Sequence, residues 1–138
     1  MMGYFKQGSV IDVHQPLGEK DNWVTDQPLT FISTKLMLEI TVPAGFTTDF
    51  ASVPWFFRRL YPKVGQYNAA AIIHDFLCRC DSIPRKDADT VFLEAMSVLG
   101  VPAMTRHPMY AAVRVGALWH KPDLLNPSCK EGKITVIR

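Results

Sequence analysis

The sequence has no long hydrophobic run. No stretch of about 18 uninterrupted apolar residues occurs in its 138 residues, so a transmembrane helix is not expected. The first residues, Met1–Lys6, also lack the charged-then-apolar order of a signal peptide. We therefore expect synthesis in the cytoplasm of a host cell without a signal peptide.

Cysteine is scarce. The chain has three cysteines, an odd number, and Cys78 and Cys80 are too close together to pair easily. No disulfide framework is therefore expected, and a reducing compartment is the default. The free cysteines are better explained as packing residues than as nucleophiles, because no base is assigned to them.

Excess charge of either sign is also missing. The net charge is +2, and the basic residues form no run longer than a pair, so nucleic acid is not indicated as a partner. The hydrophobic fraction of 48% and the charged fraction of 20% are ordinary for a globular protein. The length favours one domain over residues 1–138.

Short apolar runs in the N-terminal third predict strands, and another closes the chain. The clearest alternates with a period near two and stops at Pro43. The expected strands are Val10–Val13, Leu29–Ile32, Leu36–Val42 and Lys133–Ile137.

Helical patterns occupy the second half. The first begins near Gln66 or Asn68 and ends at Cys80, with a turn at 81–82. The second runs from Pro84 to Leu99 and is closed by Gly100, and the third runs from Met109 to Trp119 with Pro108 in its first turn. The predicted fold class is α+β: a small antiparallel sheet from the N-terminal third, packed on an antiparallel helix pair plus a third helix.

His74 and Asp75 stand inside the apolar run 69–77, where polar side chains must find partners once they lose water. Asp89 shares a helix face with Phe92 and Met96 and therefore points inward. His74 and Asp89 lie at nearly equal distances from the turn that joins their helices. The two side chains are expected to meet, the geometry in which a carboxylate orients an imidazole that acts as a general base.

Asp75 follows His74 and is rotated about 100° around the helix. It is expected to face the Gly/Thr/Ser-rich loop that carries Asp49. Carboxylate and carbonyl oxygens are the ligands that Ca²⁺ prefers. Such a cation would polarise an ester or amide carbonyl while His74 deprotonates a water.

Other interpretations of these residues stay open. A buried His–Asp pair ties two helices together without any chemistry, with Asp75 capping a loop. Zinc ligand types are present at His74, Asp75, His107 and His120, but no HExxH or CxxC spacing accompanies them.

Two further features have non-catalytic explanations. Ser52 lacks the G-x-S-x-G elbow of a serine hydrolase and suits a turn. The aromatic-basic segment Trp55–Tyr61 suits the core or a protein interface, or anchoring at a membrane surface.

Three segments together resemble an uncharacterised domain family that is widespread in tailed phages and prophages: Val42–Pro54, Ala70–Phe76 and Arg85–Phe92. The resemblance covers residues 25 to 120 approximately. It implies a phage or prophage origin and supplies no established activity.

Residues 48 to 96 also resemble, more locally, the small secreted phospholipases A2 of bacteria and fungi. That resemblance implies His74 as the general base, Asp89 as the residue that orients it, and Asp75 and Asp49 as calcium ligands. The secreted enzymes are disulfide-bonded, whereas this chain has no matching cysteines. The Gly and Tyr that usually follow their His-Asp-Phe are replaced here by Leu77-Cys78.

The expected function is therefore that of a phage- or prophage-encoded, metal-dependent hydrolase of phospholipase A2-like design, with Ca²⁺ as cofactor. The alternative is a non-catalytic structural or assembly protein of a tailed phage particle. A third possibility is a regulator of a host protein, which would need an exposed apolar patch. Expected partners are membrane lipid or other virion proteins, and association with the virion follows from either of the first two functions.

Overall fold

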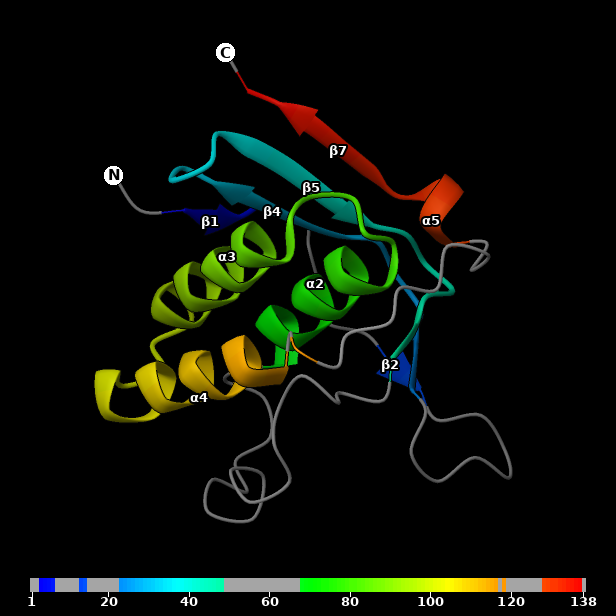
Figure 1. Cartoon of the computed structure of the whole chain (residues 1–138). Coiled ribbons are helices and arrows are strands. Elements are labelled where there is room, and N and C mark those ends of the chain that lie inside the picture. Colours follow the sequence, from blue (N-terminus) through cyan, green and yellow to red (C-terminus); the bar gives the residue numbers. More distant parts are fainter. Residues whose placement is uncertain are drawn as a thin grey trace.

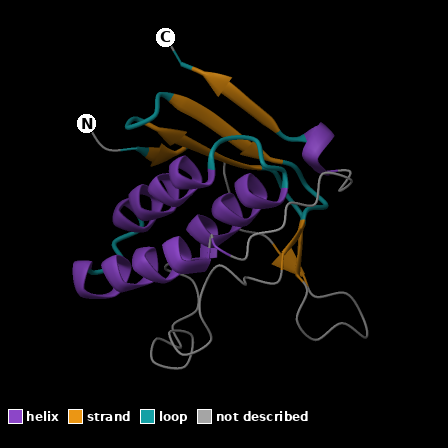
Figure 2. Cartoon of the chain, in the orientation of Figure 1, coloured by secondary structure: helices purple, strands orange, loops and turns teal. Residues whose placement is uncertain are grey.

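The computed structural model describes residues 3–6, 13–14, 23–48, 68–116, 118 and 128–137. Strands come first along the chain, helices follow, and one strand returns at the C-terminal end (Figure 1). The helices α2, α3 and α4 lie on one side of the larger sheet (Figure 2). This arrangement confirms the predicted α+β class.

Antiparallel pairing builds both sheets. The larger has the order β1-β4-β5-β7, from strands Tyr4–Phe5, Leu29–Ser33, Leu38–Val42 and Lys133–Val136. The smaller has the order β2-β3-β6, from strands Val13–His14, Trp23–Thr25 and Thr47–Thr48. Among the predicted strands, those at β4, β5 and β7 are confirmed.

The strand β5 begins two residues later than predicted. Met37 has a φ of +54°, so the chain is still turning there and pairing starts at Leu38. The strands β1, β3 and β6 were not expected, because two or three residues are too few to produce a recognisable alternation. Of the predicted strand Val10–Val13, only Val13 falls within the described residues.

Two helices match the prediction closely. The helix α2 spans Asn68–Arg79 and α3 spans Arg85–Val98. Gly100 follows α3 with a φ of +83°, the left-handed conformation that glycine adopts without strain. The two helices run antiparallel and pack along their length (Figure 1).

The third helix begins earlier than predicted. The helix α4 spans Ala103–Gly116, so Pro108 lies inside it rather than in its first turn. The carbonyl of Pro102 accepts hydrogen bonds from Thr105 and Arg106 and starts the helix six residues before Met109. Pro108 removes only one N–H from the helix, and the remaining turns compensate. The predicted end at Trp119 lies outside the described residues.

Helix α2 forms the centre of the core. Every residue from Ala69 to Cys78 is buried, because the sheet covers one side and α3 the other. Phe76 meets Phe46 edge to face at 5.6 Å, and Gly132 lies so close to the Phe76 ring that a Cβ there would clash. Burying almost three turns of helix explains why its polar residues need internal partners.

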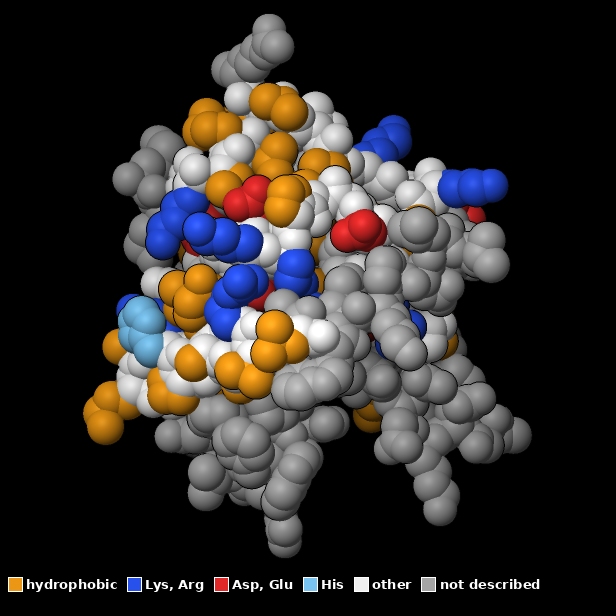
Figure 3. Space-filling view, in the orientation of Figure 1, with side chains coloured by type: hydrophobic (Ala, Val, Ile, Leu, Met, Phe, Trp, Pro, Cys, Tyr) orange, Lys and Arg blue, Asp and Glu red, His pale blue; other side chains and the backbone are white. Residues whose placement is uncertain are grey.

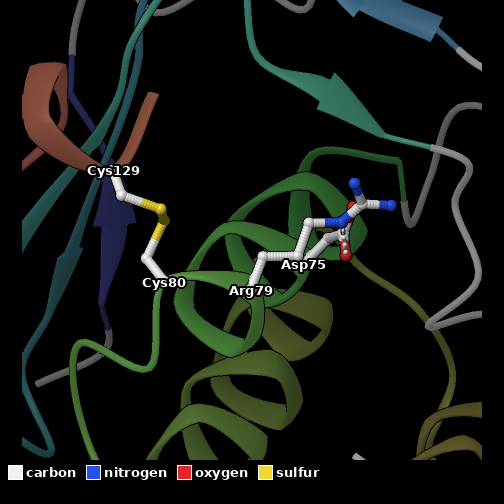
Figure 4. Close-up of a disulfide and its surroundings, with 4 residues drawn as sticks. All are labelled: Asp75, Arg79, Cys80 and Cys129. Atoms are coloured by element: carbon white, nitrogen blue, oxygen red, sulfur yellow. Dashed lines mark hydrogen bonds and ion pairs between the residues drawn. A yellow bond between two sulfur atoms is a disulfide. The ribbon is translucent and has the colours of Figure 1, made fainter. Parts of the chain in front are cut away.

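A disulfide joins Cys80 to Cys129. The prediction that the chain has no disulfide framework is therefore wrong. The pairing links the end of α2 to the short helix α5, Ser128–Glu131, across 49 positions (Figure 4). Sequence spacing did not reveal it, because only the return of β7 to the sheet brings Cys129 near Cys80. Among the described helices, none is long and apolar enough to cross a bilayer.

Candidate functional site

His74 and Asp89 meet across the α2–α3 pair. The His74 Nε2 atom lies 2.5 Å from Oδ1 of Asp89, and the two side chains are 1% and 0% exposed. The Phe92 ring packs against the imidazole with ring centroids 4.8 Å apart. The predicted contact is confirmed, and the catalytic role of the pair stays a prediction.

Two arginines complete the surroundings of Asp89. Arg85 Nε donates to Oδ1 at 2.9 Å, and Arg114 Nη1 donates to Oδ2 at 2.7 Å. Arg85 also donates from Nη2 to the carbonyl of Val113 at 3.0 Å. The carboxylate therefore connects α2, α3 and α4.

Sequence reasoning missed both arginines. Arg85 stands four positions before Asp89 on the same helix, the spacing of a favourable ion pair, and this signal was available. Arg114 gave no such signal, because only the packing of α4 on α3 brings it to the site.

The protonation states of the pair follow from this environment. Burial alone would raise the pKa of Asp89, but hydrogen bonds from His74, Arg85 and Arg114 outweigh it and hold the pKa below its usual value. Burial lowers the pKa of His74 below 6.5, against the opposing effect of Asp89. The resting state is thus a neutral imidazole facing an ionised carboxylate.

This assignment also fixes the imidazole tautomer. An ionised carboxylate can only accept, so Nε2 must carry the hydrogen that points to Asp89. In a neutral imidazole the other nitrogen, Nδ1, then holds the lone pair. His74 Nδ1 is therefore the basic atom of the cluster.

Cys78 is the third member of this cluster. Its Sγ lies 3.4 Å from His74 Nε2, one helical turn along α2. Burial raises the pKa of the Cys78 thiol to about 12. The thiol therefore stays protonated at neutral pH and does not act as a nucleophile.

His74, Cys78 and Asp89 are the group of potential metal ligands that the described part of the chain brings together. Their geometry does not suit zinc. Two ligands of a tetrahedral zinc ion at about 2.0–2.1 Å would stand roughly 3.3 Å apart, whereas His74 and Asp89 are 2.5 Å apart. Both carboxylate oxygens are also bound to guanidinium groups, which repel a cation.

Of the residues in the zinc alternative, His107 does not join His74 among the described residues. His107 is exposed on α4 and lies outside the cluster that contains His74. His120 lies outside the described residues.

Asp75 points away from the His74–Asp89 pair, as its position on α2 requires. Its Oδ1 accepts a hydrogen bond from Arg79 Nε at 3.0 Å, one turn along α2 (Figure 4). A cation at Asp75 must therefore share the carboxylate with a guanidinium. Asp49, Ser52 and the segment Trp55–Tyr61 lie outside the described residues, so the predicted pairing of Asp49 with Asp75 stays a prediction.

Comparison with known proteins places the chain in a family. The model of a family described as "Protein of unknown function (DUF1353)" matches residues 23–113. The chain belongs to this family. The match includes His74, Asp75 and Asp89, and it ends one residue before Arg114.

One curated relative shares part of the chain. It is an uncharacterised protein, y4jT, of Sinorhizobium fredii (strain NBRC 101917 / NGR234), 36% identical over 78 residues. The shared region covers 55% of this chain and 23% of the relative, so this chain spans less than a quarter of that protein. No solved structure matches the chain.

Proposed function

We propose that this protein is a hydrolase of esters or amides, encoded by a phage or prophage, in which His74 is the general base and Asp89 orients it. The observation that carries the proposal is the 2.5 Å contact between His74 Nε2 and an Asp89 carboxylate whose ionised form two arginines maintain. That arrangement leaves Nδ1 as a base on a neutral imidazole, the state that general-base catalysis requires at neutral pH.

In the proposed reaction His74 first accepts a proton and later gives it to the leaving group. His74 Nδ1 removes a proton from water, and the water oxygen attacks the carbonyl carbon of the substrate. Asp89 stabilises the imidazolium that forms, which then returns the proton to the leaving alcohol or amine as the carbon–heteroatom bond breaks. Because His74 is 1% exposed, turnover requires a path that opens to Nδ1.

A calcium ion belongs to the full proposal. Asp75 and Asp49 supply the hard oxygen ligands that Ca²⁺ prefers, and the ion would polarise the substrate carbonyl. Arg79 already binds one oxygen of Asp75, so calcium must compete with it or use the second oxygen. Added Ca²⁺ is accordingly a separate variable in the test.

The proposal also covers the partners of the protein and the place where it acts. Membrane lipid and other virion proteins are the proposed partners, and the virion is the proposed destination. The Cys80–Cys129 disulfide supports a working environment that is less reducing than the cytosol in which the chain is made.

The direct test measures hydrolysis of phospholipid vesicles and of p-nitrophenyl esters, with Ca²⁺ or with a chelator. We expect His74→Gln to lower the rate by about 10²–10⁴-fold. The matched control is His107→Gln, which changes an exposed histidine on α4 and should leave the rate unchanged. Circular dichroism and thermal unfolding verify that both variants are folded. Equal rates in all three proteins would refute the proposal.

An exposed apolar stripe on α4 favours the second candidate, a non-catalytic structural or assembly protein of a phage particle. Met104 and Val115 are 90% and 55% exposed, and Leu118 beyond the helix is 77% exposed. With Pro108 and Ala111 they follow a four-three spacing, which suits pairing with another helix. A stripe of this kind also suits a regulator that binds a host protein.

A structural or assembly protein would give the opposite result in the hydrolysis assay. No substrate is hydrolysed with or without Ca²⁺, whereas Met104→Lys and Leu118→Lys abolish incorporation into particles. His74→Gln then changes the free energy of unfolding and nothing else.

A further inference from the structure

A small hollow on the surface lies away from the His74–Asp89 pair. A hollow of about 160 Å³ opens where the β4–β5 turn meets the end of α3 and the first turns of α4. Leu93 and Val98 contribute its apolar lining, and Ser97 adds a hydroxyl. Figure 3 shows that basic and apolar side chains lie side by side over α3 and α4.

Three basic side chains surround the hollow: Lys35, Arg106 and His107. Within the described part of the chain, neither the Lys35 ammonium nor the His107 ring has a hydrogen-bonded partner. Arg106 uses Nη1 to reach the carbonyl of Val101 at 2.9 Å, and its other N–H groups have no hydrogen-bonded partner among the described residues. Several donors are therefore available to a bound group.

Glu94 is the acidic residue in the lining, and both of its carboxylate oxygens already accept hydrogen bonds. It accepts four hydrogen bonds from the end of β4 and the turn that follows: from the Ser33 hydroxyl, from the Thr34 hydroxyl and N–H, and from the Lys35 N–H. It is only 5% exposed. Lys35 and Arg106 together outweigh the single negative charge of Glu94, so the hollow presents a net positive charge and open donors above an apolar surface.

We propose that this hollow binds a small organic oxyanion. A phosphate or carboxylate group would lie against Lys35, Arg106 and His107, and a short apolar part would cover Leu93 and Val98. A hollow of this size suits a ligand whose bound part is an oxyanion with a short apolar segment. The site does not depend on the proposed hydrolase activity.

Titration of the ¹⁵N-labelled full chain with inorganic phosphate, acetate and butyrate tests the proposal, with chloride adjusting the ionic strength. We expect saturable shifts in the amide signals of Lys35, Ser97, Arg106 and His107. Butyrate should bind more tightly than acetate, because its carbon chain reaches the apolar lining. The relative affinities for phosphate and for the carboxylates identify the preferred oxyanion.

Two variants and a control locate the binding. Lys35→Gln removes a charge that has no hydrogen-bonded partner among the described residues, so the fold is not disturbed. The double variant that combines Lys35→Gln with Arg106→Gln should weaken binding about tenfold, which corresponds to about 1.4 kcal/mol. Lys130→Gln changes an exposed lysine on α5 and should have no effect. Shifts that never saturate, or affinities that both variants leave unchanged, would overturn the proposal.

Discussion

Asp89 and Glu94 are two buried carboxylates on the same helix, little more than one turn apart, with contrasting partners. Asp89 is held by two guanidinium groups and an imidazole. Glu94 is held by hydroxyl and backbone N–H groups at the end of β4 and in the β4–β5 turn. The first arrangement places a base beside an ionised acid. The second fixes the shape of a turn against α3.

The difference shows that a buried acid is not by itself a sign of chemistry. Neutral donors satisfy a carboxylate and leave nothing nearby that exchanges protons at neutral pH. An imidazole in hydrogen-bonding contact does provide such a group. The partners of each acid, rather than its burial, separate a candidate catalytic position from an architectural one.

The largest expected effect is on hydrolysis. Asp89→Asn should lower the rate by about 10²–10⁴-fold, because the amide no longer stabilises the imidazolium of His74. Glu94→Gln on the same helix should keep the rate within about threefold of the unmodified chain, since its partners lie in a turn. Initial rates on p-nitrophenyl esters, measured for chains verified as folded, make the comparison. A large loss in Glu94→Gln would remove the distinction between the two acids.

The arginines should contribute unequally to stability. Arg85→Gln removes bonds to Asp89 and to the Val113 carbonyl from a side chain that is 19% exposed, and should lower the free energy of unfolding by about 1.5–3 kcal/mol. Arg114→Gln acts at a side chain that is 37% exposed and should lower it by about 1 kcal/mol or less. Urea denaturation measures both. The reverse order would mean that α4, rather than α3, provides the main support of Asp89.

Glu94 should affect stability through the turn that it holds. Glu94→Gln replaces one acceptor oxygen with a donor that faces other donors, and should lower the free energy of unfolding by about 1–3 kcal/mol. Ser33→Ala removes the 2.6 Å bond alone and should have the smaller effect. Hydrogen exchange at Thr34 and Lys35 should quicken in both variants. Unchanged exchange there would show that the turn does not need the acid.

The last expected effect is a gradual dependence of stability on pH that comes from His74 and Asp89. Burial holds the pKa of folded His74 below 6.5, so below that pH the unfolded chain binds a proton that the folded chain does not. As the pH is lowered in this range, the free energy of unfolding should fall by up to about 1.4 kcal/mol per pH unit. Asp89, whose folded pKa is below 3.8, adds a further loss as the pH falls through that value.

Two variants test whether His74 causes the pH dependence of stability below about pH 6.5. His74→Gln should flatten the pH dependence of unfolding just below about pH 6.5, and Glu94→Gln should leave it unchanged. Urea denaturation at several pH values measures the slope. A slope that survives in His74→Gln would come from another group.

Local signals were sufficient for the helix pair and for the meeting of its two polar residues. Apolar periodicity, Pro84 and Gly100 fix α3, and the positions of His74 and Asp89 relative to the turn predict their contact. Signals that depend on distant chain segments were not sufficient. The start of α4 was misplaced because Pro108 is a weaker helix boundary than Pro102, whose carbonyl starts the helix.

The sequence by itself determined the α+β class, the two central helices and the inward direction of Asp89, because helical periodicity decides which side chains share a face. Only the tertiary structure decided that Arg114 reaches Asp89, that Glu94 holds a distant turn and that Cys129 pairs with Cys80. These contacts join residues that are 25, 61 and 49 positions apart. Their formation depends on how whole elements pack, which no local pattern encodes.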